Sequence, residues 1–107
     1  MENMGKAIDA RFRDTAKAVE KLRARGARIV FVRFPNSGEL KVLEDRLNPR
    51  SRDWERLLKD TKVPGIYFED YPELASFTCP EWSHLSAGDS VEFSKRLLPH
   101  LRAALQL

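Results

Sequence analysis

The stretch Arg28-Ile-Val-Phe-Val-Arg-Phe-Pro35, "RIVFVRFP", decides how the fold is interpreted. It is a short run of β-branched and aromatic residues that ends at a proline, which is typical of a β-strand. Apolar residues follow one another from Ile29 to Val32 without alternation. A strand that helices cover on both faces has this pattern, as in a parallel sheet. The sequence therefore predicts a buried strand over residues 28–34.

Helical periodicity surrounds this strand. Residues 5–25 carry one apolar stripe, and Gly26 suits the left-handed position just after a helix. A short helix is expected over 39–47, with three leucines directed inward. A further helix is expected from the N-cap Ser51 to about residue 60, with apolar residues along one face. The inward positions are Leu40, Leu43 and Leu47 in the first of these two helices and Trp54, Leu57 and Leu58 in the second.

The C-terminal half contains a second strand and a long helix. Residues 66–68 follow Pro64-Gly65 and form a short apolar run, after which 69–85 is expected to be irregular. Ser86, with Asp89 three positions later, has capping-box spacing. The last helix has apolar residues at four-residue steps and should be kinked at an internal proline. Those apolar residues are Phe93, Leu97, Leu101 and Leu105, and the proline is Pro99.

The predicted order is α-β-α-α-β-α in one small α/β domain that spans residues 1–107. Two strands joined through helices should be parallel. A sheet of two parallel strands has two open edges, which proteins normally cover. We therefore expect a second copy of the chain, in a homodimer or higher homo-oligomer, or a missing part of a longer protein to complete the sheet.

Composition narrows the classes of function. The formal net charge is +3, from 19 basic and 16 acidic side chains that are interspersed, which does not favour a nucleic-acid groove. The densest basic cluster surrounds an expected helix end. Cys79 is the single cysteine, so neither an internal disulfide nor a zinc site is expected, and no cofactor is indicated. No apolar run of membrane-spanning length or signal peptide is apparent, so the default compartment is cytoplasmic. The basic cluster is Lys21, Arg23, Arg25 and Arg28.

Polar residues follow both strands. The carboxyl ends of parallel strands meet at one edge of a sheet, where ligands bind in open α/β folds. The sequence therefore predicts that Asn36, Ser37, Asp70, Glu81 and His84 share one rim. An imidazole titrates near neutral pH, and a carboxylate can fix its tautomer, so His84 and Glu81 form a candidate base and orienting acid. The structural alternative is that His84 packs under the start of the last helix.

The sequence Pro80-Glu-Trp-Ser-His-Leu-Ser86, followed by an amphipathic helix, resembles the C-terminal catalytic block of the SGNH (GDSL-like) hydrolases. That block is usually Asp-x-x-His before the final helix. The strand over 29–34 and the strand over 66–68 look like the last two strands of that fold. The resemblance implies a partial flavodoxin-like unit, equivalent to the C-terminal third to half of a family member. It is nearest to SGNH-like proteins of bacterial envelopes and acyl transfer, which would imply a periplasmic location.

The resemblance implies that His84 is a general base and Glu81 its carboxylate partner, although the family usually has Asp there. The nucleophile block, the oxyanion-hole Gly block and the Asn block are absent. Gly88-Asp89-Ser90 is interpreted as the start of the last helix rather than as a nucleophile motif. A base without these groups loses most of its catalytic value, because they act as a unit. The first hypothesis is therefore a fragment of a serine esterase or acyltransferase, inactive alone, whose nucleophile comes from a longer protein or a partner chain.

Other assignments stay open. The second hypothesis is a non-catalytic module that self-associates through its sheet edges, and the third is a basic module that binds nucleic acid. Weaker site candidates are Ser37 as a substitute nucleophile, Asp70 as an extra carboxylate and Cys79 beside His84. Trp82 is a candidate for ligand stacking. His100 is expected to be a surface group and Trp54 a core residue.

Overall fold

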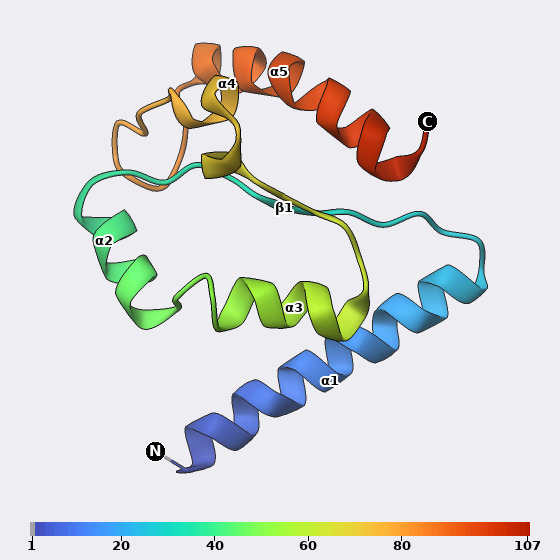
Figure 1. The fold of residues 1–107 in the computed structure, drawn as a ribbon. Helices are drawn as coiled ribbons and strands as arrows, with labels where there is room; N and C mark the ends of the chain where they lie inside the picture. Colours follow the sequence, from blue (N-terminus) through green and yellow to red (C-terminus); the bar gives the residue numbers. More distant parts are fainter. Residues whose placement is uncertain (1) are drawn as a thin grey trace.

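The computed structural model describes residues 2–107 of the chain, with side chains from residue 3 onward. The structure is mixed α/β and mostly helical, with a small open sheet at its centre (Figure 1). The order of helices and strands agrees with the prediction, apart from short helical turns after the second strand. The elements are α1 (Glu2–Ala24), β1 (Phe31–Arg33), α2 (Gly38–Leu47), α3 (Asp53–Thr61), β2 (Gly65–Tyr67), η1 (Phe68–Asp70), α4 (Pro72–Ala75) and α5 (Ala87–Leu105).

The sheet consists of β1 and β2, which are parallel as predicted. Their register pairs Phe31 with Gly65 and Arg33 with Tyr67. Both strands are three residues long, so β1 is shorter than the predicted 28–34. The prediction that β1 is buried on both faces was wrong, because all three of its residues are only half-buried.

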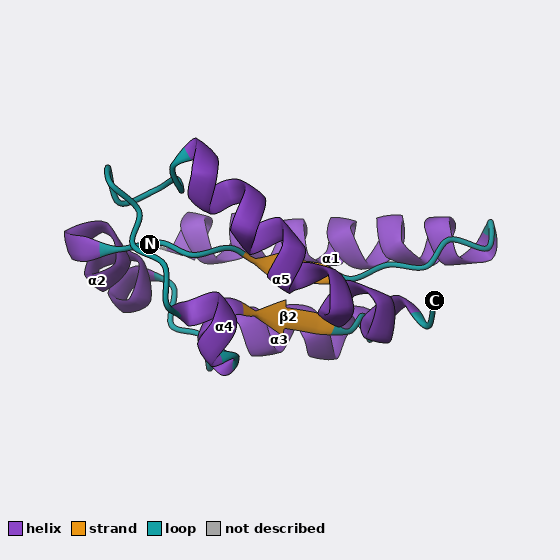
Figure 2. Cartoon of the chain, turned by 90° about the horizontal axis from the view of Figure 1, so that it is seen from above, coloured by secondary structure: helices purple, strands orange, loops and turns teal. Residues whose placement is uncertain are grey.

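Helices lie on both faces of the sheet (Figures 1 and 2). One face carries α4 and α5, and the other faces α1 and α3. Alternation along β2 assigns its side chains to these layers. Gly65 meets α3, where an added Cβ would lie 2.6 Å from Trp54 Cζ2 and 2.8 Å from both Leu58 methyl carbons. Ile66 faces the opposite layer and joins the main core. This close approach explains why a glycine begins β2.

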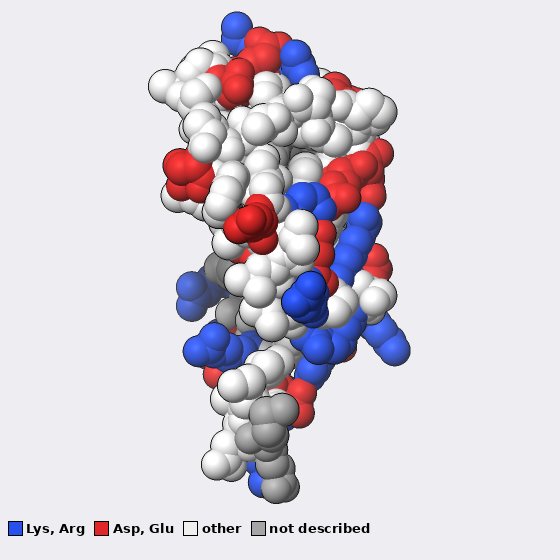
Figure 3. Space-filling view, turned by 90° about the vertical axis from the view of Figure 1, so that its left-hand side faces the viewer, with Lys and Arg blue, Asp and Glu red and all other residues white. Residues whose placement is uncertain are grey.

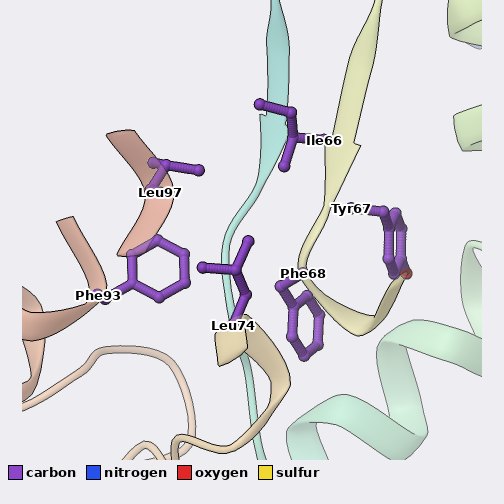
Figure 4. Close-up of a cluster of buried hydrophobic side chains, with 6 residues drawn as sticks. All are labelled: Ile66, Tyr67, Phe68, Leu74, Phe93 and Leu97. Carbon is purple, nitrogen blue, oxygen red and sulfur yellow. The ribbon is translucent and has the colours of Figure 1, made fainter. Parts of the chain in front are cut away.

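The main core lies between β2, α4 and α5 (Figure 4). Leu74 from α4 is fully buried at its centre, so the predicted irregular stretch 69–85 contains a helical turn that supplies a core residue. Phe93 and Leu97 of α5 are buried as their four-residue spacing predicted. The core cluster comprises Ile66, Phe68, Leu74, Phe93 and Leu97, and it also includes Tyr67, whose ring lies against Trp54 of α3.

The basic cluster after α1 binds the ends of two other helices. The Arg23 guanidinium donates to the carbonyl oxygens of Thr61 and Lys62, at 2.7 and 2.6 Å, where α3 ends. Arg28 donates to the carbonyls of Leu105 and Gln106, at 3.1 and 2.9 Å, where α5 ends. Cations stabilise the carbonyl end of a helix. A structural role therefore accounts for two of the four clustered basic residues.

The predicted helix ends and N-caps are confirmed for α1 and α5 but not for α3. Gly26 has a φ of +86°, as predicted for the position after α1. The Ser86 hydroxyl accepts from the Asp89 N–H at 3.2 Å, which confirms the predicted cap of α5. Ser51 is not the N-cap of its helix, because α3 begins at Asp53 and Arg52 precedes it. Within residues 2–107, no helix is long and apolar enough to cross a membrane.

The prediction that the α2 leucines face inward was wrong for two of them. All ten residues of α2 are described and none is buried, and Leu43 and Leu47 are about half exposed. Figure 3 views the molecule from the side on which α2 lies. Much of the surface on this side carries no charged side chains. The reason is that α2 sits at the end of the sheet and not against either face (Figure 2).

Candidate functional site at the carboxyl rim of the sheet

The loops that follow the two strands meet as the topology predicted. The Ser37 N–H donates to the Trp82 carbonyl oxygen at 2.9 Å. The Cys79 N–H donates to Ser37 Oγ, also at 2.9 Å, and Cys79 Sγ lies 3.4 Å from the Pro35 carbonyl oxygen. The loop after β1 is thus bonded to the loop that carries residues 81–84.

Trp82 lies in the loop that carries residues 81–84 and has an unusual backbone conformation. Its φ is +74°, an uncommon left-handed conformation for a residue with a side chain. The Trp82 N–H donates to the Cys79 carbonyl at 3.0 Å, and its indole lies directly over Gly38. A Cβ on Gly38 would be 2.5 Å from Trp82 Cδ1 and Nε1. The ring therefore packs on the start of α2, while Trp82 as a whole residue stays 45% exposed.

Glu81, Ser83 and His84 form one hydrogen-bonded group on the exposed side of this loop. Glu81 Oε1 lies 3.0 Å from His84 Nδ1. The Ser83 hydroxyl donates to Glu81 Oε2 at 2.5 Å, and its oxygen is 2.8 Å from the same Nδ1. The Ser83 hydroxyl bond, with smaller contributions from His84, lowers the pKa of the Glu81 carboxyl. All these contacts are satisfied when Nδ1 carries the imidazole proton.

The arrangement orients an imidazole but does not assemble a complete triad. The His84 side chain is 84% exposed, so it does not pack under α5, and no described residue bonds its Nε2. In a serine hydrolase the acid binds one ring nitrogen and the nucleophile contacts the other. Ser83 shares Nδ1 with Glu81 and is therefore not placed as a nucleophile on Nε2. Ser83 was not predicted as a member of this group, although its position in the sequence between Glu81 and His84 was a signal that could have identified it.

The other rim candidates have separate partners. Both Asp70 carboxylate oxygens accept from the Arg50 guanidinium, at 2.6 and 2.7 Å, which lowers the pKa of Asp70. The buried Asn36 donates from Nδ2 to Glu44 Oε2 at 2.6 Å. The Ser37 hydroxyl accepts from the Cys79 backbone. None of the hydrogen bonds or ion pairs described for these side chains involves Glu81 or His84.

The remaining candidates take part in packing, in hydrogen bonds or in a helix start. Cys79 is 1% exposed and packs as a small core residue. His100 is half-buried, with Nε2 2.8 Å from Glu73 Oε1 and its ring against Tyr71. Ser90 lies in the first turn of α5, where its N–H donates to the Ser86 carbonyl, as the helix-start interpretation predicted. Trp54 is half-buried beside the core.

Among residues 2–107, no group of three or more His, Cys, Asp and Glu side chains is arranged to hold a metal ion. Comparisons with models of protein families, with curated proteins and with solved structures found no match.

Proposed function

We propose that this chain carries the base half of a serine hydrolase or acyl-transfer site of the SGNH type. In this proposal His84 is the general base and Glu81 is its orienting acid. The nucleophile and the oxyanion donors come from another chain or from a longer form of the protein. The observation that carries the proposal is the 3.0 Å contact between Glu81 Oε1 and His84 Nδ1, which leaves Nε2 accessible.

The location of the pair supports this assignment. It lies on loops at the carboxyl ends of two parallel strands, where sites of open α/β folds form. The loop is held by backbone bonds from Ser37 and Cys79, so the imidazole projects from an anchored segment. A partial flavodoxin-like arrangement of the SGNH kind, with β1 and β2 as its last two strands, would place the missing groups beyond the open edge of the sheet.

The tautomer of His84 tests the base role directly. A general base needs a bare Nε2, so we expect the neutral ring to carry its proton on Nδ1. His100 is an internal control because its Nε2 faces Glu73, which predicts the opposite tautomer. Long-range ¹H–¹⁵N spectra at neutral to alkaline pH distinguish the two forms. An Nε2-protonated His84 in the native protein would remove the basis of the proposal.

Labelling with a serine-directed fluorophosphonate tests the need for a second half. The purified chain should not be labelled, because no described serine contacts Nε2 of His84. In an extract of the native source, affinity capture of the chain should recover a labelled serine protein or a longer labelled form. Substitution His84→Ala should remove the labelling without removing the capture. His84-dependent labelling of Ser37, Ser83 or Ser90 in the purified chain would show instead that the site is complete.

A second candidate function is self-association without catalysis. Its supporting observations are the two open sheet edges and a group of exposed apolar residues that we call the α2 patch. Helical spacing places Leu43 and Leu47 side by side, and Trp82 covers Gly38, one turn before Val42. A homodimer would cover this patch together with a sheet edge. The α2 patch comprises Val42, Leu43, Leu47 and Trp82, which are 61%, 49%, 57% and 45% exposed. Sedimentation equilibrium over a concentration series tests this candidate, and a monomer throughout would exclude it.

A further inference from the structure

A cavity of about 450 Å³ lies on the face of the sheet that α1 and α3 share. Its size falls within the range of about 300–1,000 Å³ that small-molecule sites occupy. Arg33 and Tyr67, the last residues of β1 and β2, line it together with Phe12 of α1. No lining residue belongs to the loop of His84, so this cavity is separate from the site described above.

Three aromatic side chains, Phe12, Trp54 and Tyr67, contribute to the cavity lining. Trp54 and Tyr67 meet edge to face, with ring centroids 5.3 Å apart and an interplanar angle of 76°. Phe12 contributes a third ring, on which the Arg56 guanidinium lies 4.1 Å from the centroid. Leu57 adds an aliphatic surface. Rings at a large angle to one another, with an aliphatic neighbour, provide apolar contact for both the faces and the edge of a planar ligand.

The carboxylates at the cavity already have cationic or amide partners. Glu44 Oε2 accepts from Arg33 and Asn36, each at 2.6 Å. Asp45 accepts from Lys41 at 2.6 Å, and Asp53 accepts from Arg52 at 2.8 and 2.9 Å. These pairs largely neutralise the negative charge of the lining.

The guanidinium groups at the cavity differ in their availability. Arg33 is bound to Glu44, and Arg50 is bound to Asp70 while it lies over the Tyr67 ring at 4.1 Å. Arg11 forms no hydrogen bond or ion pair through its side chain with any residue whose side chain the structure describes. Arg11 is therefore the lining cation that is available to an incoming anion.

We propose that this cavity binds a small planar aromatic molecule with a single negative charge. The ring lies against Phe12, Trp54 and Tyr67, and its carboxylate or equivalent anionic group pairs with Arg11. A single charge is preferred because the other two lining guanidinium groups, Arg33 and Arg50, are already paired with Glu44 and Asp70, so only Arg11 is available to an anionic group. The proposal depends neither on catalysis by His84 nor on self-association.

Three probes with the same ring test the charge preference: 1-naphthoate, 1-naphthalenemethanol and 1-naphthylmethylamine. Titration is followed through the two tryptophan indole ¹H–¹⁵N signals, which the variant Trp82→Phe assigns. Naphthoate should shift the Trp54 signal and saturate. It should bind about threefold more tightly than the neutral alcohol, in line with the strength of an exposed ion pair, and the cationic amine should bind most weakly. Equal affinities for all three probes, or naphthoate shifts confined to Trp82, would overturn the proposal.

Two variants test the location. Thr15→Phe places a ring in the cavity from a half-buried position of α1 and should abolish the Trp54 shift while the helical circular dichroism stays unchanged. Arg11→Gln should weaken naphthoate about threefold and leave the alcohol unaffected. Arg13→Gln, on the same helix but outside the cavity, is the matched control and should change neither affinity. Unaltered naphthoate binding by a folded Thr15→Phe variant, or equal effects of Arg11→Gln and Arg13→Gln, would disprove the assignment.

Discussion

Gly65 is required by packing and not by backbone conformation. A methyl group at this position would overlap the Trp54 ring and both Leu58 methyl carbons, at 2.6–2.8 Å. Both neighbours are half-buried side chains on α3, so relief requires the Trp54 and Leu58 side chains to turn aside or α3 to move away from β2. We expect Gly65→Ala to lower the free energy of unfolding by about 1–3 kcal/mol, as overpacking typically does. Urea denaturation measures this change.

Gly88 provides the matched control for this substitution. It lies in the first turn of α5, and an added Cβ would meet no atom within 4 Å. Gly88→Ala should therefore leave stability unchanged or raise it by up to about 1 kcal/mol, because alanine loses less backbone entropy in a helix. Equal destabilisation by both substitutions would contradict the steric explanation.

The Arg50–Asp70 pair should make stability depend on pH. The two hydrogen bonds from Arg50 hold the pKa of Asp70 below its usual value in the folded chain. A depressed carboxyl pKa contributes stability above the unfolded pKa of about 3.9 and loses it as the pH falls through the folded pKa. Both side chains are roughly 40% exposed, so solvent screening limits the contribution to about 0.5–1 kcal/mol.

Asp70→Asn tests this dependence. The substitution should destabilise the protein near pH 7, and the difference from the wild type should shrink as the pH approaches about 2. Urea midpoints at the two pH values measure it. Asp14→Asn, in the exposed middle of α1, should show no such trend. A difference that is constant with pH would show that the pair does not act through the ionised carboxylate.

At the scale of residues, the sequence predicted that Glu81 and His84 lie together but did not predict the details of their contacts. A three-residue spacing before a helix start is a local signal, and the structure brings the two side chains to 3.0 Å. Asp70 was grouped with them because it also follows a strand. It turned out to pair with Arg50, 20 residues earlier, and sequence spacing cannot reveal a partner set by the packing of α3.

At the scale of elements, the long helices and the two strands were predictable, whereas the exposed face of α2 was not. Periodicity over many residues identified α1 and α5, and the apolar runs identified β1 and β2. α4 has only four residues, too few for a periodic signal, yet its Leu74 is at the core centre. The α2 leucines suggested a buried face, but their burial depends on a neighbour that the described chain does not place there.

The contacts between Arg23 and the end of α3 should stabilise the packing of α1 on α3. The guanidinium bonds two terminal carbonyls, one of them on the buried residue Thr61. We expect Arg23→Gln to lower the free energy of unfolding by about 1 kcal/mol, since charged hydrogen bonds at a helix end are lost. Thermal and urea denaturation measure the change. Arg25→Gln, two positions later and exposed, is the control and should stay within about 0.5 kcal/mol of the wild type.

At the scale of the whole molecule, the sheet and the apolar surface both leave room for a second copy. A two-stranded parallel sheet exposes backbone groups along both edges, which folded proteins usually cover. The α2 patch adds apolar area on the end of the molecule where α2 lies (Figures 1 and 3). If a second copy covers this patch, amides of α2 should become more protected from hydrogen exchange as the protein concentration rises.

Leu43→Lys tests whether the α2 patch lies in such an interface. Leu43 lies between Val42 and Leu47 in the patch, so a charge there should be desolvated on association and should weaken a dimer about tenfold or more. Leu98→Lys is the matched control, because Leu98 is a similarly exposed leucine, at 45% against 49%, on α5 and outside the patch. Sedimentation equilibrium of the three proteins gives the dissociation constants. Equal weakening by both substitutions would place the interface elsewhere. Because neither residue lines the cavity beside α1, both variants should still bind naphthoate, which separates the outcome of this experiment from that of the ligand titration.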